Sequence, residues 1–398
     1  MDRKKKYRRL LLWFLCLDLL AVVWFGYRYL ERKIPDELFV SEGKEEQVKN
    51  VLDFPFLSFD DAITVSGDGS YLLKARILGV IPFKDVKITP ADSESVMVSG
   101  DTVGIYMETD GVLVIDTGEI VSQEGFTQEP AKNIVKPGDY IVAFNDQTVH
   151  SKKELIEDLS KLDDSQVTLE VIRNGEKIPL SITPVKDVRG EYKLGVWVRD
   201  NTQGIGTLTY ISEDGHFGAL GHPINDSDTG KRVSVRKGGL YESQIQMIIR
   251  GKNGTPGSFC GIICYDTSTF LGNIYENTSC GIYGNVSALM KEKLVRSALM
   301  QTAHKEEVVC GKAFLRCAVN GEPQDYEVEI IKTQPGSTGG FQICVTDKLL
   351  LEKTGGIIQG MSGSPLIQNG KMIGAVTHVF VNDPTKGYAI YAEDMLNH

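Results

Sequence analysis

A short glycine-rich stretch near the C-terminal end carries the residues whose types and spacing best suit chemistry. Residues 360–365 read Gly-Met-Ser-Gly-Ser-Pro, so Ser362 stands on a tight turn that glycine permits. A serine nucleophile needs an exposed hydroxyl and converging backbone N–H groups, which Gly360 and Ser362 could supply as an oxyanion hole. A merely polar turn has the same composition, but the hairpin signal Asn369-Gly370 and an apolar strand follow. The stretch therefore favours a nucleophile followed by a β-hairpin.

Three histidines are candidates for the general base that a serine nucleophile needs. An imidazole is suited to this role because it is neutral near pH 7 and can still accept a proton. His222 follows a run of small residues and enters a polar loop, which makes it the preferred candidate. His216 stands in an Asp-Gly-His hairpin context, and His378 lies on a strand just after the serine turn. Both remain rivals.

The composition limits the class of protein. A length of 398 residues is enough for two or three domains. The net charge of −10 argues against nucleic-acid binding, which needs concentrated positive charge. The sequence has no P-loop or dinucleotide-binding fingerprint, so we expect no nucleotide cofactor. Short apolar runs alternate with glycine-rich turns among 41 glycines, a pattern that indicates a mostly β protein.

The cysteines give no metal signature. Of the seven, six lie between Cys260 and Cys344, and they could form disulfides outside the cytoplasm. Cys260 and Cys264 form a C-x3-C pair without histidines at ligand spacing, so we expect no metal site. We expect most of the thiols to be small buried apolar groups. The sequence leaves any pairing open.

The N-terminal region has the pattern of a membrane anchor. Residues 1–9 are strongly basic, and residues 10–30 are apolar for long enough to cross a bilayer. The basic flank predicts a cytoplasmic N-terminus and an exported remainder. Asp18 argues against this assignment, at about 2.5–3.5 kcal/mol in the bilayer centre. A cleaved signal peptide and a soluble core helix are the alternatives, and we favour a single-pass signal anchor.

Two segments connect this anchor to the first recognisable domain. Residues 31–53 are charged and without periodicity, which indicates a solvated linker, the kind of segment where proteolytic nicking is easiest. Residues 54–98 contain short apolar runs that predict a small β-rich segment.

Residues 99–186 resemble a PDZ domain. The segment 136–145 reads as a turn that enters a strand, and Ser151 with Glu154 forms a capping box at the start of a helix. PDZ domains bind extended peptides by strand addition and hold a terminal carboxylate with loop N–H groups. The alternative is a structural loop in a domain that docks on its own chain. We expect the carboxylate loop at Val103, Gly104 and Ile105.

Three motifs stand out in residues 194–398, at 217–222, 353–365 and 374–384. Together they resemble the peptidase domain of the stage IV sporulation protein B family of endospore-forming bacteria, and the resemblance extends to the anchor and the PDZ domain. One departure is Pro223-Ile224 directly after the histidine, where Gly-Ile is more typical. The resemblance implies a mostly β chain: one N-terminal transmembrane helix, a PDZ domain, then a trypsin-like double β-barrel peptidase domain.

The resemblance also implies roles for single residues. By position, His222 is the base and Ser362 the nucleophile. Asp347 matches the acid of the family and is our preferred third member. Asp266 stays open as an alternative, because its separation from the histidine is closer to that of trypsin-like enzymes generally.

The implied function is that of a membrane-anchored serine endopeptidase in sporulation. Family members cleave their own N-terminal region and a membrane-bound regulator, which releases an intramembrane metalloprotease that processes a late sigma factor. They work in the space between the forespore and mother-cell membranes, and self-cleavage could release the remainder from the membrane. The expected partners are this regulator, the chain's own N-terminal region, C-terminal peptides bound by the PDZ domain, and the membrane.

Two other functions are alternatives for this sequence. One is a non-catalytic PDZ adaptor with a degenerate barrel, disfavoured because a scaffold has little physical reason to keep both His222 and an intact serine turn. The other is a quality-control protease of the heat-shock type, in which the PDZ domain usually follows the peptidase.

Overall fold

The chain forms two compact units. The first comprises Met1–Glu94, Ala303–Cys310 and Lys332–Gly340, and the second comprises the rest of the chain. A computed structural model describes residues 2–34, 36–40, 56–60, 63–64, 70–90, 93–163, 166–288, 290, 299–333 and 340–397. Most of the expected 31–53 linker lies outside these ranges.

The first unit begins with the long helix α1 (Asp2–Lys33). Its segment Lys4–Glu31 contains an 18-residue window with a mean hydropathy of 2.1, and it is long and apolar enough to cross a membrane. At about 1.5 Å per residue it exceeds the roughly 30 Å hydrocarbon core of a bilayer. The helix is therefore a candidate membrane anchor, as predicted.

A small sheet follows in the same unit. Its core consists of Ile34, Leu38, Leu73, Val86 and Ile88. The strand order is β1-β5-β4-β2, with β3 paired to β4. The strands are β1 (Glu37–Val40), β2 (Leu57–Phe59), β3 (Ile63–Thr64), β4 (Tyr71–Ile77) and β5 (Ile81–Pro90).

The second unit contains a first six-stranded barrel. Its strands follow one another in the order β7-β18-β20-β21-β17-β16, and a pairing of β16 with β7 closes the ring. Val103, Ile105, Leu208, Phe217 and Ile282 are among the side chains that fill its core. The strands are β7 (Thr102–Thr117), β16 (Val196–Ser212), β17 (His216–Ala219), β18 (Val235–Ile249), β20 (Phe270–Thr278) and β21 (Gly281–Val286).

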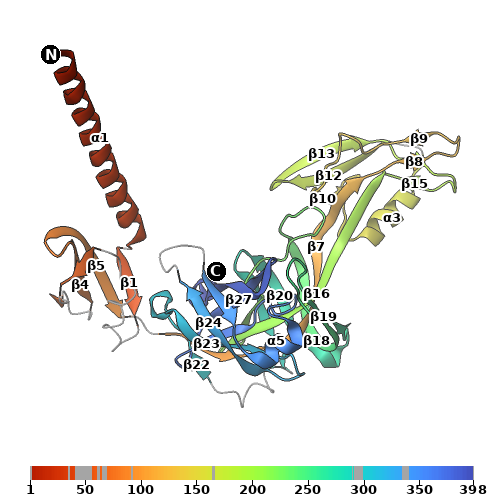
Figure 1. Ribbon diagram of the computed structural model, residues 1–398. Coiled ribbons are helices and arrows are strands. Elements are labelled where there is room, and N and C mark those ends of the chain that lie inside the picture. The colour runs from red at the N-terminus through yellow and green to blue at the C-terminus, as the bar shows by residue number, and fades with distance from the viewer. Residues whose placement is uncertain are drawn as a thin grey trace. The chain divides into compact units, whose positions relative to one another are not determined.

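The predicted PDZ domain is built from the far ends of two barrel strands (Figure 1). Beyond Gly111, β7 pairs with β10, and residues 196–199 of β16 pair with the same end of β7. The core of this domain includes Val112, Ile141 and Leu155. Its other main elements are β10 (Tyr140–Phe144), α3 (Lys152–Ser160), β12 (Val167–Arg173) and β13 (Glu176–Ile182).

This sharing of strands differs from the expected sequence of domains at 99–186 and 194–398. Residues 102–109 of β7 already belong to the barrel, so the PDZ domain is an insertion between two barrel strands. A strand of 16 residues spans roughly 50 Å at about 3.3 Å per residue, enough to enter both sheets.

The residues predicted to form the carboxylate loop are part of the same strand, β7. Val103, Gly104 and Ile105 pair with β16 on one side and with β18 on the other. The side chains of Val103 and Ile105 are buried in the barrel core. Their backbone groups belong to a sheet ladder and form no loop that could hold a peptide carboxylate. The interpretation as a PDZ carboxylate loop is wrong.

The second barrel is closed by the order β23-β24-β25-β28-β27-β26, which completes the predicted double β-barrel. Asn369 and Gly370 both have positive φ, at 52° and 75°, and form the predicted hairpin turn between β26 and β27. The strands are β23 (Gly311–Cys317), β24 (Gln324–Lys332), β25 (Phe341–Val345), β26 (Pro365–Gln368), β27 (Lys371–Phe380) and β28 (Asp383–Tyr391).

Shorter elements complete the described chain. They are β6 (Ser95–Val98), β8 (Ile120–Val121), β9 (Thr127–Gln128), β11 (Gln147–Thr148), β14 (Val185–Lys186), β15 (Tyr192–Lys193), β19 (Ser258–Ile263), η1 (Thr267–Thr269), β22 (Leu299–Gln301), η2 (Lys305–Glu307), α5 (Lys348–Thr354) and α6 (Ala392–Leu396).

All seven cysteines are unpaired. Cys317 alone is fully buried, and burial raises its pKa to about 12. The expectation that most thiols are buried is therefore wrong.

Candidate active site

The serine turn of the second barrel is fastened to β16 of the first. The N–H of Thr207 donates to the carbonyl of Ser362 at 3.0 Å, and the Thr207 hydroxyl donates to the carbonyl of Gly360 at 2.8 Å. The hydroxyl of Thr209 donates to the carbonyl of Gly363 at 2.7 Å. Both threonines are fully buried. The turn therefore sits at the junction of the two barrels.

Two glycines of the turn are required by its backbone. Gly360 and Gly363 have φ of 100° and 91°, a region that side chains resist. A Cβ on Gly360 would lie 2.5 Å from the Phe259 ring, and one on Gly363 would lie 2.3 Å from the Thr207 carbonyl oxygen. Gly363 is thus the more tightly constrained, because it faces backbone.

Only some of the backbone N–H groups of the turn donate hydrogen bonds within the described part of the protein. Those of Met361, Gly363 and Ser364 donate to main-chain carbonyls. Within the described residues, the N–H groups of Gly360 and Ser362 have no recorded acceptor. These two donors, two residues apart, are the pair predicted for an oxyanion hole, and they are available to a ligand oxygen.

His222 lies on a turn that follows β17. Its Nδ1 is 2.8 Å from the carbonyl oxygen of Pro223. Because a carbonyl can only accept, Nδ1 carries the proton and Nε2 keeps its lone pair. Burial lowers the pKa of His222 and the neighbouring His378 lowers it further, although the Pro223 contact opposes this. The ring is therefore neutral at pH 7 and can accept a proton at Nε2.

His222, Ser362 and Gly360 line one cavity of about 280 Å³. In the described residues, no hydrogen bond joins the serine to the histidine, since the Ser362 hydroxyl donates to the carbonyl of Thr377 at 2.8 Å. In unliganded sites such bonds are often long or absent and form only with substrate. The structure thus brings the nucleophile candidate, the base candidate and a predicted oxyanion donor to one cavity.

The two rival histidines have different surroundings. His378 packs against His222 with ring centroids 4.8 Å apart and an interplanar angle of 38°. His216 is exposed and lies 3.3 Å from Asp214, next to the Tyr275 hydroxyl. His216 does not line the cavity.

The two candidate acids do not contact the base. The carboxylate of Asp347 caps helix α5, where it accepts from the N–H of Leu350 at 3.0 Å. The carboxylate of Asp266 caps η1 and accepts from the N–H of Ser268 at 2.8 Å. No bond from either to His222 is recorded among the described residues. The expected contact between Asp347 and the histidine is not made among the described residues, and the Pro223 carbonyl occupies the Nδ1 side.

An open groove continues from this cavity. It has a volume of about 650 Å³ and shares Ile205, Gln359 and Gly360 with the cavity. Strand β19 contributes apolar side chains, of which Ile262 is 58% exposed and nearby Tyr265 51% exposed. β19 pairs with β18 along one edge. The groove suits an extended, partly apolar chain.

Several residues of the site were not predicted from the sequence. Pro223 gave only the signal of a departure from a motif. Thr207 gave no signal because its contacts join it to a turn more than 150 residues away, and the contact of Thr377 depends on the folding of the hairpin that follows Ser362. No three His, Cys, Asp or Glu side chains of the described ranges gather as a metal site requires.

Comparison with known families gives two matches. The model of the SpoIVB peptidase S55 family matches residues 190–396. The PDZ domain model matches residues 88–183.

Solved structures with similarity include two PDZ domains. One is from the SdrC-like protein of Listeria innocua, with 24% identity over 23% of this chain and 94% of that one and a TM-score of 0.20. The other is from the SdrC-like protein of Listeria monocytogenes. It has 19% identity over 22% of this chain and 87% of that one, with a TM-score of 0.19. The inactive form of the Rv3671c protease matches with 14% identity over 48% of this chain and 81% of that one, at a TM-score of 0.26.

Proposed function

The chain belongs to the SpoIVB peptidase S55 family and is a serine peptidase with a PDZ domain, and on that premise we propose that it is a membrane-anchored endopeptidase with Ser362 as nucleophile and His222 as general base. The observation that carries the proposal is the shared cavity of these two side chains beside Gly360. A further support is that, in the part of the chain that the structure describes, the N–H groups of Gly360 and Ser362 have no acceptor and could bind an oxyanion.

The proposed reaction begins when the Ser362 hydroxyl leaves the Thr377 carbonyl and donates to Nε2 of His222. The serine oxygen then bonds to the peptide carbonyl carbon, and its proton passes to Nε2. The negative charge on the carbonyl oxygen is stabilised by the N–H groups of Gly360 and Ser362. His222 returns the proton to the departing amine, and water hydrolyses the acyl-enzyme by the same route. The Pro223 carbonyl stabilises the imidazolium through Nδ1–H.

The substrate is an extended polypeptide. The groove beside the cavity is open and its β19 side is apolar, which suits a chain segment with exposed backbone groups and apolar side chains. The PDZ domain is proposed to bind C-terminal peptides of substrates.

We also propose the biological role that family membership suggests. The enzyme would cleave its own N-terminal region and a membrane-bound regulator during sporulation, and the second cleavage would release an intramembrane metalloprotease that processes a late sigma factor. Helix α1 and the basic residues before its apolar core support a cytoplasmic N-terminus. The bulk would lie between the forespore and mother-cell membranes, and cleavage within 31–53 would free it from the anchor.

The test uses the full-length protein in lipid nanodiscs, followed by intact mass and by labelling with diisopropyl fluorophosphate. Wild type is compared with Ser362→Ala and His222→Ala, and Ser212→Ala serves as a control in an exposed hairpin of the first barrel. We expect label on Ser362 and fragments that begin within 31–53 in wild type and the control alone. Unlabelled and uncleaved wild-type protein in the presence of C-terminal peptides would favour the adaptor alternative.

A further inference from the structure

The orientation of the base depends on the loop that follows it. The Nδ1 atom of His222 is bonded to the carbonyl of the next residue, Pro223, at 2.8 Å. A carboxylate would hold the ring from a separate element, but a carbonyl of the same loop moves with that loop. We call residues 223–234 the base loop. Whatever fixes the base loop also fixes the imidazole.

Both ends of the base loop are bonded to the same side-chain amide of the first barrel. Asn277 on β20 accepts from the N–H of Ile224 at 2.9 Å and donates to its carbonyl at 2.8 Å. The same amide donates to the carbonyl of Val233 at 2.9 Å. The two stems of the base loop are therefore held together from inside the barrel.

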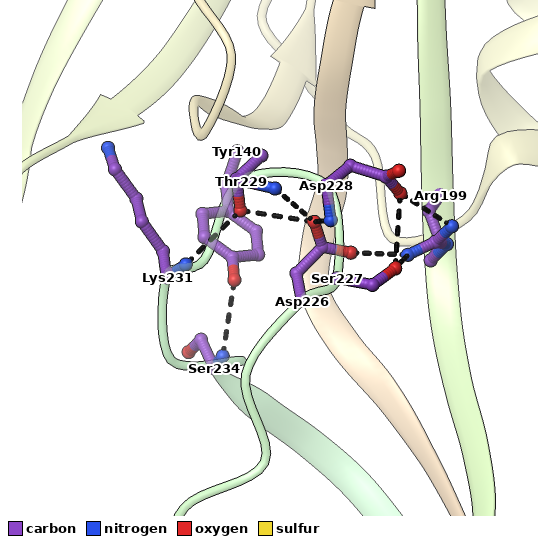
Figure 2. A network of polar contacts seen from close by, with 8 residues as sticks. All are labelled: Tyr140, Arg199, Asp226, Ser227, Asp228, Thr229, Lys231 and Ser234. Atoms are coloured by element: carbon purple, nitrogen blue, oxygen red, sulfur yellow. Dashed lines mark hydrogen bonds and ion pairs between the residues drawn. The ribbon is translucent and has the colours of Figure 1, made fainter. Parts of the chain in front are cut away.

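The centre of the base loop is organised around one buried carboxylate (Figure 2). Asp226 is 3% exposed and accepts from the N–H of Thr229 at 2.9 Å, from the Thr229 hydroxyl at 3.1 Å and from the N–H of Asp228 at 3.1 Å. Burial alone would raise the pKa of Asp226, but these hydrogen bonds and the charge of Arg199 outweigh it and lower the pKa. The group is therefore ionised at neutral pH.

Arg199 pairs with the base loop from strand β16. Its Nη1 lies 2.5 Å from Oδ2 of Asp226, and its Nη2 lies 2.9 Å from Oδ2 of Asp228. The guanidinium thus bridges two carboxylates of the base loop in a forked geometry that lysine cannot reproduce. Arg199 is also the residue of β16 that pairs with Leu113, within the part of β7 that belongs to the PDZ domain.

The PDZ domain contacts the base loop directly. The hydroxyl of Tyr140 on β10 accepts from the N–H of Ser234 at 3.3 Å (Figure 2). A Cβ on Gly138 would lie 2.7 Å from the Lys231 side chain, which therefore packs on the turn before β10. The base loop is held by the barrel at its stems and by the PDZ side along its length.

We propose that Asp226 and Arg199 are positioning residues of the peptidase, which hold the base loop so that the Pro223 carbonyl orients His222, and that Tyr140 makes this orientation depend on the PDZ domain. The proposal rests on the proposed function. Neither residue touches substrate, and both act through the loop. A displacement of the base by about 1 Å is enough to lower a catalysed rate by up to about 100-fold.

The test measures the rate at which diisopropyl fluorophosphate modifies Ser362, together with kcat and KM for one peptide substrate. Full-length protein carries Arg199→Met, Arg199→Lys, Asp226→Asn or Tyr140→Phe. The matched control is Glu108→Gln, which breaks an ion pair of the first barrel. In this pair, Oε2 of Glu108 lies 2.5 Å from Nη2 of Arg236. Each rate is measured well below the Tm of its variant, so that unfolding does not contribute.

We expect Arg199→Met and Asp226→Asn to lower the labelling rate and kcat at least about tenfold with KM nearly unchanged. Arg199→Lys should recover part of the loss, because it restores the charge without the fork. Tyr140→Phe should lower the rate about two- to fivefold, as one hydrogen bond is lost. The control should stay within about twofold of wild type.

The positioning role and its dependence on the PDZ domain are contradicted by different results. Wild-type labelling rates in both Arg199→Met and Asp226→Asn would overturn the positioning role. A wild-type rate in Tyr140→Phe beside slow Arg199→Met would overturn the dependence on the PDZ domain. Failure of the proposed function itself would be recognised in wild type, where Ser362 would not be labelled or His222→Ala would be labelled equally fast.

Discussion

The hydroxyl of Ser362 donates to the main-chain carbonyl of Thr377 at 2.8 Å. Thr377 lies on β27 and is almost fully buried. The nucleophile candidate is therefore held at rest by the neighbouring strand of its own barrel, and the base has no part in holding it. In the proposed mechanism, the hydroxyl exchanges this acceptor for Nε2 of His222.

Ser362→Ala should abolish peptidase activity while leaving the fold intact. The loss of a nucleophile in such enzymes reaches about 10⁴- to 10⁶-fold in kcat. Among the described residues, the hydroxyl forms one hydrogen bond, to the Thr377 carbonyl, so the free energy of unfolding should change by about 1 kcal/mol or less. Peptide cleavage and urea denaturation of the same preparation provide the check. A variant that keeps a tenth of the activity would exclude Ser362 as the nucleophile.

The pH dependence of kcat/KM should report a base with a lowered pKa. Burial and His378 lower the pKa of His222 from its ordinary 6.5. Only the neutral ring accepts a proton, so activity should rise with pH through a midpoint below 6.5 and then level off. A midpoint above 6.5 would contradict the burial argument.

His378→Gln should shift the same profile. Protonated His378 repels a proton on His222, and its removal should move the midpoint upward, toward 6.5. The measurement is the acid limb of kcat/KM at low ionic strength, compared with wild type. An unchanged midpoint would mean that the two rings do not interact electrostatically.

His222 also affects stability with a definite sign. Because its pKa is lower in the folded protein, the unfolded chain binds more protons at a pH between the two values. The free energy of unfolding should therefore fall as the pH decreases below 6.5, until the folded ring is protonated. His222→Gln should remove this contribution, which urea denaturation between pH 7 and 5 would reveal by difference.

Gly363→Ala should be much more harmful than a matched glycine change elsewhere. Gly321 has φ of 94° but nothing within 4 Å of an added Cβ, whereas Gly363 has φ of 91° and the Thr207 carbonyl at 2.3 Å. Gly321→Ala should thus cost only the strain of positive φ, about 1–2 kcal/mol. Gly363→Ala should cost more and also lower activity, since Ser362 must move. Equal Tm values for the two variants would refute the clash.

The parts of the site that could be predicted carry local signals. The Gly-x-Ser-Gly turn, the Asn369-Gly370 hairpin and the Ser151 cap depend on residues close in sequence, and the structure contains each of them. His222 was singled out because of the small-residue strand before it. The contacts of Thr207 join segments more than 150 residues apart, so no local pattern could indicate them. Thr377 lies 15 residues after Ser362, and its contact depends on how the β26–β27 hairpin folds back on the serine turn.

The incorrect predictions of a carboxylate loop and of two consecutive domains share one physical cause, which is that the same local composition fits both a loop and a strand. Gly104 was interpreted as a loop glycine, but it is a strand glycine over which Ile263 packs, at 2.3 Å from an added Cβ. Asp110-Gly111 has the composition of a turn, but β7 continues through it, and Gly111 takes φ of 96° where the strand passes into the PDZ domain. The insertion of the PDZ domain was hidden for this reason.

Asp347 provides the sharpest remaining test, because its helix-capping role and the acid role that the family resemblance implied make opposite predictions. A serine also caps helices well, so Asp347→Ser should retain both stability and activity if the carboxylate serves only α5. Asp347→Ala should lose the cap, at about 0.5–2 kcal/mol of stability, with the midpoint of the kcat/KM profile unchanged. Thermal denaturation and peptide cleavage of the two variants separate the roles. If Asp347→Ser is stable but loses several orders of magnitude in kcat, the carboxylate reaches His222 in the working enzyme, and the Pro223 carbonyl is a resting partner that it displaces.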